Sequence, residues 1–288
     1  MAVERRQGGA RPAMQAPVLA AGQVSVLHAR LFAWYAANRR ALPWRETTDP
    51  YAILVSEVML QQTQVARVIP AYGAFLAAFP SLATLAGAQL ADVLRRWRGL
   101  GYNNRAGQLW RCAHACIAAR APGRPASLPA DVDGLMALPG VGPYTARAVM
   151  AFAYNADVAA VDANVRRVLI HELRLSPDLP ERTLQAVADQ VLPRGRSRDW
   201  HNAVMDYGAL VLTARATGIA PRTRQGPFEG SRRWQRSRLL RSLLDDGPQT
   251  VTGLAAHLGL GRDVIDDLIA ALECDGLVHR AGGRVIVA

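Results

Sequence analysis

The chain has 288 residues and contains no lysine, so all 34 of its basic residues are arginines. Because Schiff-base formation needs a side-chain amine, no lysine-dependent covalent chemistry is available to this sequence. Acidic residues number 23, which leaves a formal net charge of +11. An excess of positive charge on a chain of this size indicates an anionic polymer, usually nucleic acid, as the partner.

Cysteine and long apolar runs are also scarce. The three cysteines, Cys112, Cys116 and Cys274, make no disulfide framework, and we expect free thiols. No apolar run approaches the roughly 20 residues of a membrane span, and no signal peptide is recognised at the start. These absences predict a cytoplasmic protein without a membrane partner. Residues 1–23, with three arginines among Ala, Gly and Pro, are expected to form a disordered basic tail.

Helical signals dominate, and strand signals are almost absent before the last dozen residues. Asp49 followed by Pro50 is typical of an N-cap and a first helical position, and the helix that they begin is expected to run to about Gln64. We therefore predict an all-α fold. Short Pro and Gly breaks separate the other expected helices, which are Leu27–Asn38, Val65–Phe79, Leu90–Trp97, Asn104–Arg120, Asp131–Ala137, Tyr144–Tyr154, Ala163–Leu173, Glu181–Leu192 and Trp200–Ala214.

The C-terminal part changes character. Residues 194–241 contain 11 arginines against three acidic residues, and residues 214–230 show no clear period, so a basic linker is expected there. Alternation on both sides of Ala281-Gly-Gly283 predicts a β-hairpin. Three helices followed by a hairpin resemble a winged-helix module at residues 231–288, a unit that binds DNA in some proteins and docks proteins in others. The three helices are expected at Ser231–Asp245, Thr250–Leu258 and Gly261–Cys274.

The most informative stretch is Leu138-Pro-Gly-Val-Gly-Pro-Tyr-Thr-Ala146. A helix is expected to end at Leu138, the segment Gly140-Val141-Gly142 to form a tight hairpin, and Pro143 to begin the next helix. The N–H groups at a helix start point outward and favour an anion. The hairpin therefore suits a DNA phosphate and reads no base sequence. An ion bound at this hairpin would use its backbone carbonyls.

Two carboxylates are expected in opposite environments. Glu57 shares its helix face with Ile53, Leu54 and Leu60, so desolvation should raise its pKa and let it act as a general acid. Asp162 follows an apolar run and precedes a helix, whose N–H groups should hold it ionised. Breaking an N-glycosidic bond uses both: one protonates the departing base and the other stabilises an oxocarbenium-like sugar. Taken alone, each carboxylate could also be structural.

Five segments carry a resemblance to a known family: Leu42-Pro-Trp-Arg45, Ser56–Val65, Gly99-Leu-Gly-Tyr102, the hairpin and Val161–Val165. Together they resemble MutY-type adenine DNA glycosylases of the helix-hairpin-helix superfamily. The resemblance covers about residues 25–213 and implies a two-lobed core at residues 24–213. One lobe of six helices would span about residues 50–158, and the other would combine residues 24–49 with residues 159–213.

The resemblance implies a role for each matching residue. Glu57 would protonate the base and Asp162 would stabilise the sugar cation, while Tyr144 and Asn164 would orient the two carboxylates. Gln62 would enter the DNA where the base is flipped out. The resemblance also implies DNA contacts by Tyr102, Asn103, Gly140, Val141, Gly142 and Thr145, and a base pocket that includes Arg45, Val65 and Asn202.

The chain departs from the family pattern at four places. Leu212 stands where the first of four iron–sulfur ligands would be, so we expect no cluster and no other cofactor. Asn103 replaces the second tyrosine of its segment, and Asn202 replaces a glutamine near the adenine. We expect no domain for recognition of 8-oxoguanine, and the winged-helix-like module is expected in its place.

These features predict a monofunctional DNA glycosylase of base excision repair that acts as a monomer on double-stranded DNA. Tyr144 replaces the lyase lysine of the endonuclease III group, in agreement with the absence of lysine. The first candidate substrate is adenine opposite guanine or 8-oxoguanine. Because Asn202 could pair with a pyrimidine edge, the alternatives are thymine or uracil opposite guanine, or an oxidised thymine such as 5-hydroxymethyluracil. A non-catalytic winged-helix DNA-binding protein is the alternative of another class.

Overall fold

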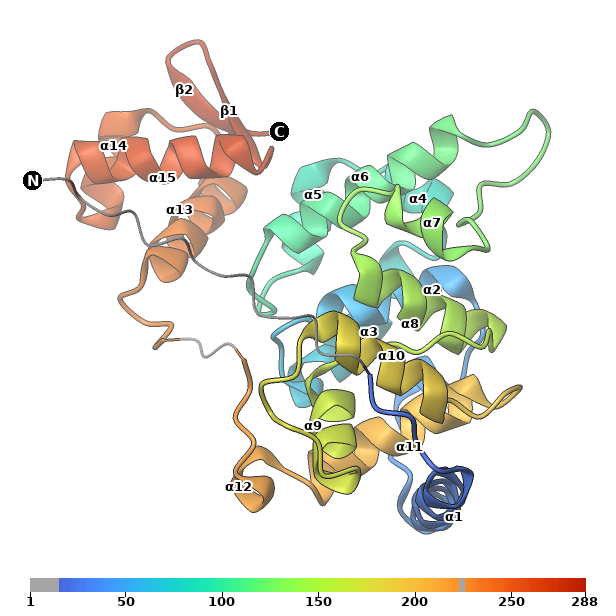
Figure 1. The fold of residues 1–288 in the computed structure, drawn as a ribbon. Helices are drawn as coiled ribbons and strands as arrows, with labels where there is room; N and C mark the ends of the chain where they lie inside the picture. Colours follow the sequence, from blue (N-terminus) through green and yellow to red (C-terminus); the bar gives the residue numbers. More distant parts are fainter. Residues whose placement is uncertain (1–15, 223–225) are drawn as a thin grey trace, which may run out of the picture. The chain divides into compact units, whose positions relative to one another are not determined.

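A computed structural model describes residues 16–222 and 226–288, which form helices and one two-stranded sheet (Figure 1). The predicted all-α character is confirmed. Residues 1–15 of the predicted tail and residues 223–225 of the predicted linker lie outside the described residues. The elements before the C-terminal module are α1 (Ala21–Asn38), η1 (Pro43–Arg45), α2 (Pro50–Leu60), α3 (Val65–Ala78), α4 (Leu82–Ala86), α5 (Leu90–Arg96), α6 (Asn104–Ala118), α7 (Val132–Met136), α8 (Pro143–Tyr154), α9 (Ala163–Glu172), α10 (Glu181–Val191), α11 (Ser197–Leu210) and α12 (Ala214–Thr217).

The chain forms two compact units. The first unit combines the described residues up to Arg39 with Asp157–Pro221, and the second combines Arg40–Ala156 with the described residues after Pro221. The first unit therefore joins the N-terminal helix to a later segment, and the second joins the C-terminal module to residues 40–156.

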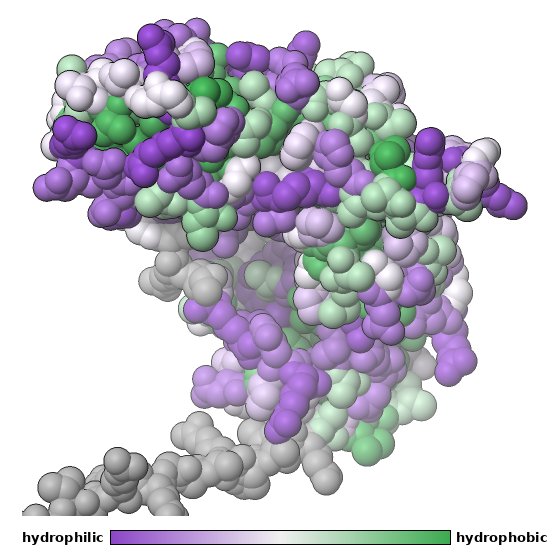
Figure 2. Space-filling view, turned by 90° about the horizontal axis from the view of Figure 1, so that it is seen from above, coloured by the Kyte–Doolittle hydropathy of each residue, from purple (hydrophilic) through white to green (hydrophobic). Residues whose placement is uncertain are grey.

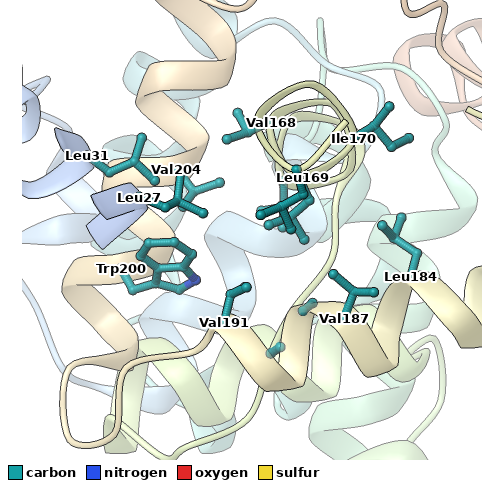
Figure 3. Packing of buried hydrophobic residues seen from close by; sticks show 14 of the residues in the cluster. Leu27, Leu31, Val168, Leu169, Ile170, Leu184, Val187, Val191, Trp200 and Val204 are labelled. Atoms are coloured by element: carbon teal, nitrogen blue, oxygen red, sulfur yellow. The ribbon is translucent and has the colours of Figure 1, made fainter. Parts of the chain in front are cut away.

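One apolar cluster forms the core of the first unit (Figure 3). The buried positions of α10 recur at three- and four-residue spacing, as an amphipathic helix requires. Trp200 of α11 is 2% exposed and meets the rings of His28 and Phe32 of α1 edge-on. Helices α1, α9, α10 and α11 thus share the cluster, whose labelled members are Leu27, Leu31, Val168, Leu169, Ile170, Leu184, Val187, Val191, Trp200 and Val204.

Helix α2 is the central helix of the second unit. Its residues Tyr51–Met59 are all buried, as expected for a helix covered on every side, and it packs against α3, α6 and α8. The predicted N-cap is confirmed, because the Asp49 carboxylate accepts hydrogen bonds from the N–H groups of Tyr51 and Ala52 at 3.1 and 3.2 Å. The N-cap and Pro50 therefore fix where α2 begins.

The C-terminal module contains the three helices and the hairpin expected from the sequence, while its assignment as a winged helix remains a prediction. Its elements are α13 (Arg232–Asp246), α14 (Val251–Leu258), α15 (Arg262–Cys274), β1 (Val278–Ala281) and β2 (Arg284–Val287). The strands are antiparallel, with Val278 opposite Val287. A short isolated bridge joins Gln249 to Val285.

The sequence analysis missed three short elements, η1, α4 and α12. Helix α12 lies at the start of the predicted linker, where Thr213 caps its N-terminus and Gly218 ends it with a left-handed backbone. These elements have three to five residues, too few to show a helical period, so only their caps could have revealed them.

The surface is mixed in polarity. On the face drawn in Figure 2, hydrophilic residues predominate and hydrophobic residues appear as smaller patches between them. Among the described residues, none of the helices combines the length and the apolar character that crossing a membrane requires.

Candidate functional site

Arg105, in the first turn of α6, joins two loops of the second unit. One loop follows α2, and the other is the Gly99–Asn103 segment before α6. The guanidinium donates to the carbonyls of Val58 (2.6 Å), Met59 (2.9 Å), Gln61 (2.7 Å), Leu100 (3.2 Å) and Gly101 (3.1 Å) and to the Thr63 hydroxyl (3.0 Å). Burial lowers the pKa of Arg105 to about 10, which leaves it charged at neutral pH.

These hydrogen bonds explain where α2 ends. The predicted helix to about Gln64 is wrong, because α2 ends at Leu60. Arg105 takes the carbonyls of Val58 and Met59, which another helical turn would have used. The next residues leave the helix, and Gln62 is exposed with a left-handed φ of 55°. The loop thus presents the side chain that the family resemblance expects to enter DNA.

The second loop has the same kind of backbone strain. Tyr102 is partly exposed and has a φ of 47°, a conformation that costs a residue with a side chain about 1–2 kcal/mol. Asn103 follows it at the N-cap position of α6 and is partly exposed. The Thr63 hydroxyl also donates to the Leu100 carbonyl at 3.3 Å, so the two loops are tied directly as well as through Arg105.

The predicted helix-hairpin-helix is present as α7, Pro139–Gly142 and α8. Gly140 is exposed and left-handed (φ 75°), and a Cβ added to it would lie 2.5 Å from the Cβ of Gln108. Gly142 is exposed at the N-cap of α8, and Pro143 occupies the first helical position. Val141 between the glycines is buried and anchors the turn. The exposed backbone N–H groups at this helix start can receive an anion.

Thr145, one of the predicted DNA contacts, has a buried side chain. It is 3% exposed, and its hydroxyl accepts a hydrogen bond from the Gln61 side chain at 3.4 Å. The hydroxyl therefore links α8 to the loop after α2. Only the backbone N–H of Thr145, in the first turn of α8, is placed to take part in anion binding.

The remaining predicted residues of the second unit lie on or beside α2. Glu57 is 6% exposed within the buried run of α2, so the expected desolvated position is confirmed. Tyr144, in the first turn of α8, and Val65, the first residue of α3, are both partly exposed. Arg45 ends η1 and donates to the carbonyl of Arg40 at 3.2 Å.

In the first unit, Asp162 begins a chain of hydrogen bonds. Its carboxylate caps α9 by accepting from the Val165 N–H at 2.6 Å, which confirms the predicted N-cap, and from the Asn164 amide at 2.9 Å. Arg167 donates to the Asn164 amide oxygen at 2.6 Å and to the Gly208 carbonyl at 2.6 Å. Asn164 therefore orients Asp162, as the resemblance implies, and Arg167 orients Asn164.

The pKa of Asp162 corrects the sequence-based expectation. Burial raises the pKa of this carboxyl above its ordinary value, and the bonds from Val165 and Asn164 and the charge of Arg167 only oppose that shift. The helix N-terminus was expected to dominate, but desolvation outweighs it. Asp162 is partly exposed, and a carboxylate ionised in such a partly desolvated place is attracted to a nearby cation more strongly than one in bulk water.

His201 fixes the backbone before Asp162. Its Nε2 accepts from the Ala160 N–H at 2.8 Å, and its Nδ1 donates to the Ser197 carbonyl at 2.7 Å. Burial lowers the pKa of His201 to about 4, so the ring is neutral at physiological pH and keeps this tautomer. Asn202, expected in the base pocket, is 7% exposed beside it on α11.

Sequence reasoning missed three residues that organise these groups: Arg105, Arg167 and His201. Each bonds to backbone or side chains about 40 or more residues away. Arginine is so common here that neither Arg105 nor Arg167 stands out by type. His201 is one of only six histidines and lies on an apolar helix face, the one signal that could have drawn attention to it.

Comparison with known proteins assigns the fold to a family. A family profile described as HhH-GPD superfamily base excision DNA repair protein matches residues 55–193. An adenine DNA glycosylase of Mycolicibacterium smegmatis is 43% identical over 203 residues, which cover 69% of this chain and 68% of that protein. The chain belongs to the HhH-GPD superfamily of base excision DNA repair proteins.

Other relatives are similar over the same part. The adenine DNA glycosylase of Mycobacterium tuberculosis is 42% identical over 200 residues, and the chain spans 64% of its length. The human adenine DNA glycosylase is 36% identical over 204 residues, and the chain spans 37% of its length. The alignments each cover about two thirds of this chain.

Solved structures support the same fold. A thermostable thymine-DNA glycosylase superposes with a TM-score of 0.62 at 28% identity, over 68% of this chain and 90% of that one. A trapped endonuclease III–DNA covalent intermediate gives a TM-score of 0.60 at 20% identity, over 71% of this chain and 92% of that one, and this match bears on the fold alone.

The cysteines of this chain do not fit the iron–sulfur cluster that the resemblance implies. A cluster of this kind takes four thiolates, and the chain has three cysteines. Cys112 and Cys116 are buried four residues apart on α6, and Cys274 is exposed at the end of α15. Leu212, where the resemblance implies the first cluster ligand, is buried, and its carbonyl accepts a hydrogen bond from Arg167.

Proposed function

We propose that this protein is a monofunctional DNA glycosylase that removes adenine from a mispair in double-stranded DNA. The observation that carries the proposal is the 43% identity to an adenine DNA glycosylase over 203 residues. The oriented Asp162 and the buried Glu57 supply the two carboxyl groups that such a reaction needs. The first candidate substrate is adenine opposite guanine or 8-oxoguanine.

The proposed reaction is hydrolysis of the bond between the base and C1′ of its sugar. Glu57 gives a proton to the departing adenine, the bond electrons leave with the base, and the sugar becomes an oxocarbenium-like cation. The Asp162 carboxylate stabilises that cation electrostatically, and Asn164 and Arg167 hold it in place. Water then adds to C1′ and loses a proton to the solvent, from which Glu57 is protonated again, leaving an abasic site in an intact strand.

The absence of lysine favours hydrolysis without strand cleavage. A lyase reaction proceeds through a Schiff base between an amine and C1′. The chain offers no lysine, and the resemblance implies that Tyr144 stands where the endonuclease III group has its lyase lysine. Strand cleavage is therefore expected only after alkali treatment of the abasic product.

The protein would bind the phosphates of the DNA and would not recognise its base sequence. The Gly140–Gly142 turn and the N-terminus of α8 offer N–H groups to a phosphate. The two strained loops carry Gln62 and Tyr102, which are suited to filling the gap left by a flipped base. Arg105 keeps these two loops together.

Thymine is the second candidate base. The solved thymine-DNA glycosylase is 28% identical to this chain and superposes on 68% of it. Asn202 is buried where the family has a glutamine, and an amide in that place can pair with a pyrimidine edge. Both candidates use the same two carboxyl groups and differ only in the base that fits.

A base-release assay on defined duplexes tests the proposal. The duplexes contain adenine opposite guanine or 8-oxoguanine, thymine or uracil opposite guanine, and 5-hydroxymethyluracil, each incubated with enzyme and divided into samples with and without alkali. We expect release of adenine, with cleavage only after alkali. Release of thymine alone would favour the second candidate, cleavage without alkali would contradict monofunctional hydrolysis, and no release from any duplex would contradict the glycosylase proposal.

A further inference from the structure

Arg233 of the C-terminal module reaches the loop before α6. Its guanidinium donates to the hydroxyl of Tyr102 and lies over the Tyr102 ring, with 5.3 Å between the guanidinium carbon and the ring centroid. The same side chain donates to the Gly226 carbonyl at 3.1 Å. Tyr102 and Arg233 are 131 residues apart in the sequence, so this contact depends on how the second unit folds.

Tyr102 is the strained residue of its loop, and it is held by two arginines. Arg105 donates to the Tyr102 carbonyl at 3.4 Å and lies 5.6 Å from its ring, while Arg233 binds the hydroxyl. A left-handed tyrosine is unfavourable unless its surroundings stabilise it. Because Arg105 also binds the loop that carries Gln62, a shift of Tyr102 would change the positions of both loops.

The module is fixed to α5 and α6 by further contacts. Arg98 pairs with Asp245, and Leu277 packs so tightly on α6 that a Cβ added to Gly107 would lie 2.8 Å from it. Two more arginines of α5 and α6 donate to module carbonyls, Arg95 to Leu244 at 3.1 Å and Arg111 to Asp275 at 3.1 Å. These contacts hold the module against α5 and α6 and so fix the position from which Arg233 reaches Tyr102.

The charge of the module argues against DNA binding through its third helix. Helix α15 carries four acidic residues and one arginine, a balance that repels phosphates. Helix α13 has the arginines, but several of them are engaged: Arg232 with Asp267, Arg236 with Asp275 and Arg233 with Tyr102. Three of the five arginines of α13 thus serve contacts within the second unit.

We propose that Arg233 is a positioning residue that sets the Tyr102 loop, and through Arg105 the Gln62 loop, for binding of distorted DNA. The inference deepens the proposed function, on which it rests for the role of the two loops. The C-terminal module then acts on the DNA site through Tyr102, rather than by touching DNA itself.

A double-mutant cycle tests the coupling between the two side chains. The variants are Arg233→Gln, Tyr102→Phe and the combination, and the measurement is the Kd for a duplex with a tetrahydrofuran abasic site, which needs no base release. We expect each single variant to weaken binding roughly tenfold, as for loss of a charge-assisted hydrogen bond. The double variant should bind no more weakly than either single variant.

Salt dependence separates positioning from a direct phosphate contact. A positioning role leaves the slope of log Kd against log salt unchanged in Arg233→Gln, whereas loss of one phosphate contact lowers it by about one. Arg232→Gln is the matched control, because Arg232 is adjacent on α13 and pairs with Asp267 inside the module. It should bind as the wild type does.

Three results would overturn the proposal: wild-type affinity in Arg233→Gln, effects of the two single variants that multiply in the double variant, or a reduced salt slope. Tyr102→Phe keeps the test decisive if Arg233→Gln folds poorly, since it removes the hydroxyl without touching the module. Wild-type affinity in Tyr102→Phe would then contradict the coupling. Because the readout is binding to an abasic duplex, a failed base-release assay is distinguishable from a failed coupling.

Discussion

Acid is expected to destabilise the first unit through His201, which holds the backbone two residues before Asp162. The ring is 1% exposed, and burial lowers its pKa from 6.5 to about 4. Because the folded state resists protonation, the stabilising contribution is complete above pH 6.5 and is lost as the pH falls towards 4. A difference of 2.5 pKa units corresponds to about 3 kcal/mol in total, of which about 2 kcal/mol falls between pH 7 and pH 4.5.

Urea denaturation at pH 7 and pH 4.5 measures this loss in the wild type and in His201→Gln, whose side chain does not titrate. Other groups also change their charge over this range, so the comparison uses the difference between the two proteins. We expect the free energy of unfolding to fall by about 2 kcal/mol more in the wild type than in the variant. Equal pH dependence in both proteins would refute the burial and the tautomer assigned to His201.

Two further substitutions test the groups around the site. Arg167→Gln removes hydrogen bonds to Asn164 and Gly208 from a buried position, so we expect the free energy of unfolding to fall by roughly 3 kcal/mol. Arg182→Gln, on the exposed face of α10, should leave it unchanged. Thermal denaturation of the two variants and the wild type measures the difference. Gly140→Ala strains a left-handed turn, and its Cβ would meet the Gln108 side chain, so duplex binding measured by fluorescence anisotropy should weaken roughly tenfold. Gly73→Ala, where a Cβ meets nothing within 4 Å, should bind normally.

Features set by neighbouring residues could be predicted from the sequence. The N-caps at Asp49 and Asp162, the hairpin at Gly140–Gly142 and most helix boundaries depend on a few adjacent side chains. The buried position of Glu57 followed from its apolar helix neighbours. Local rules of capping and periodicity are enough for such features.

Features set by distant residues could not be predicted. Helix α2 ends early because Arg105, more than 40 residues away, takes its carbonyls. The pKa of Asp162 is raised because its carboxyl is desolvated by the folded chain, which no local pattern reveals. The contact from Arg233 to Tyr102 spans 131 residues and required the packing of α13 beside α5.

The single-turnover rate of adenine release by Asp162→Asn tests the central claim most directly. The matched control is Asp178→Asn, which makes the same change at an exposed aspartate of the same unit. If Asp162 stabilises the sugar cation, the rate should fall by roughly a hundredfold or more while the affinity for an abasic duplex persists. Release by Asp162→Asn at the rate of the wild type and of Asp178→Asn would contradict the assignment of this carboxylate to catalysis.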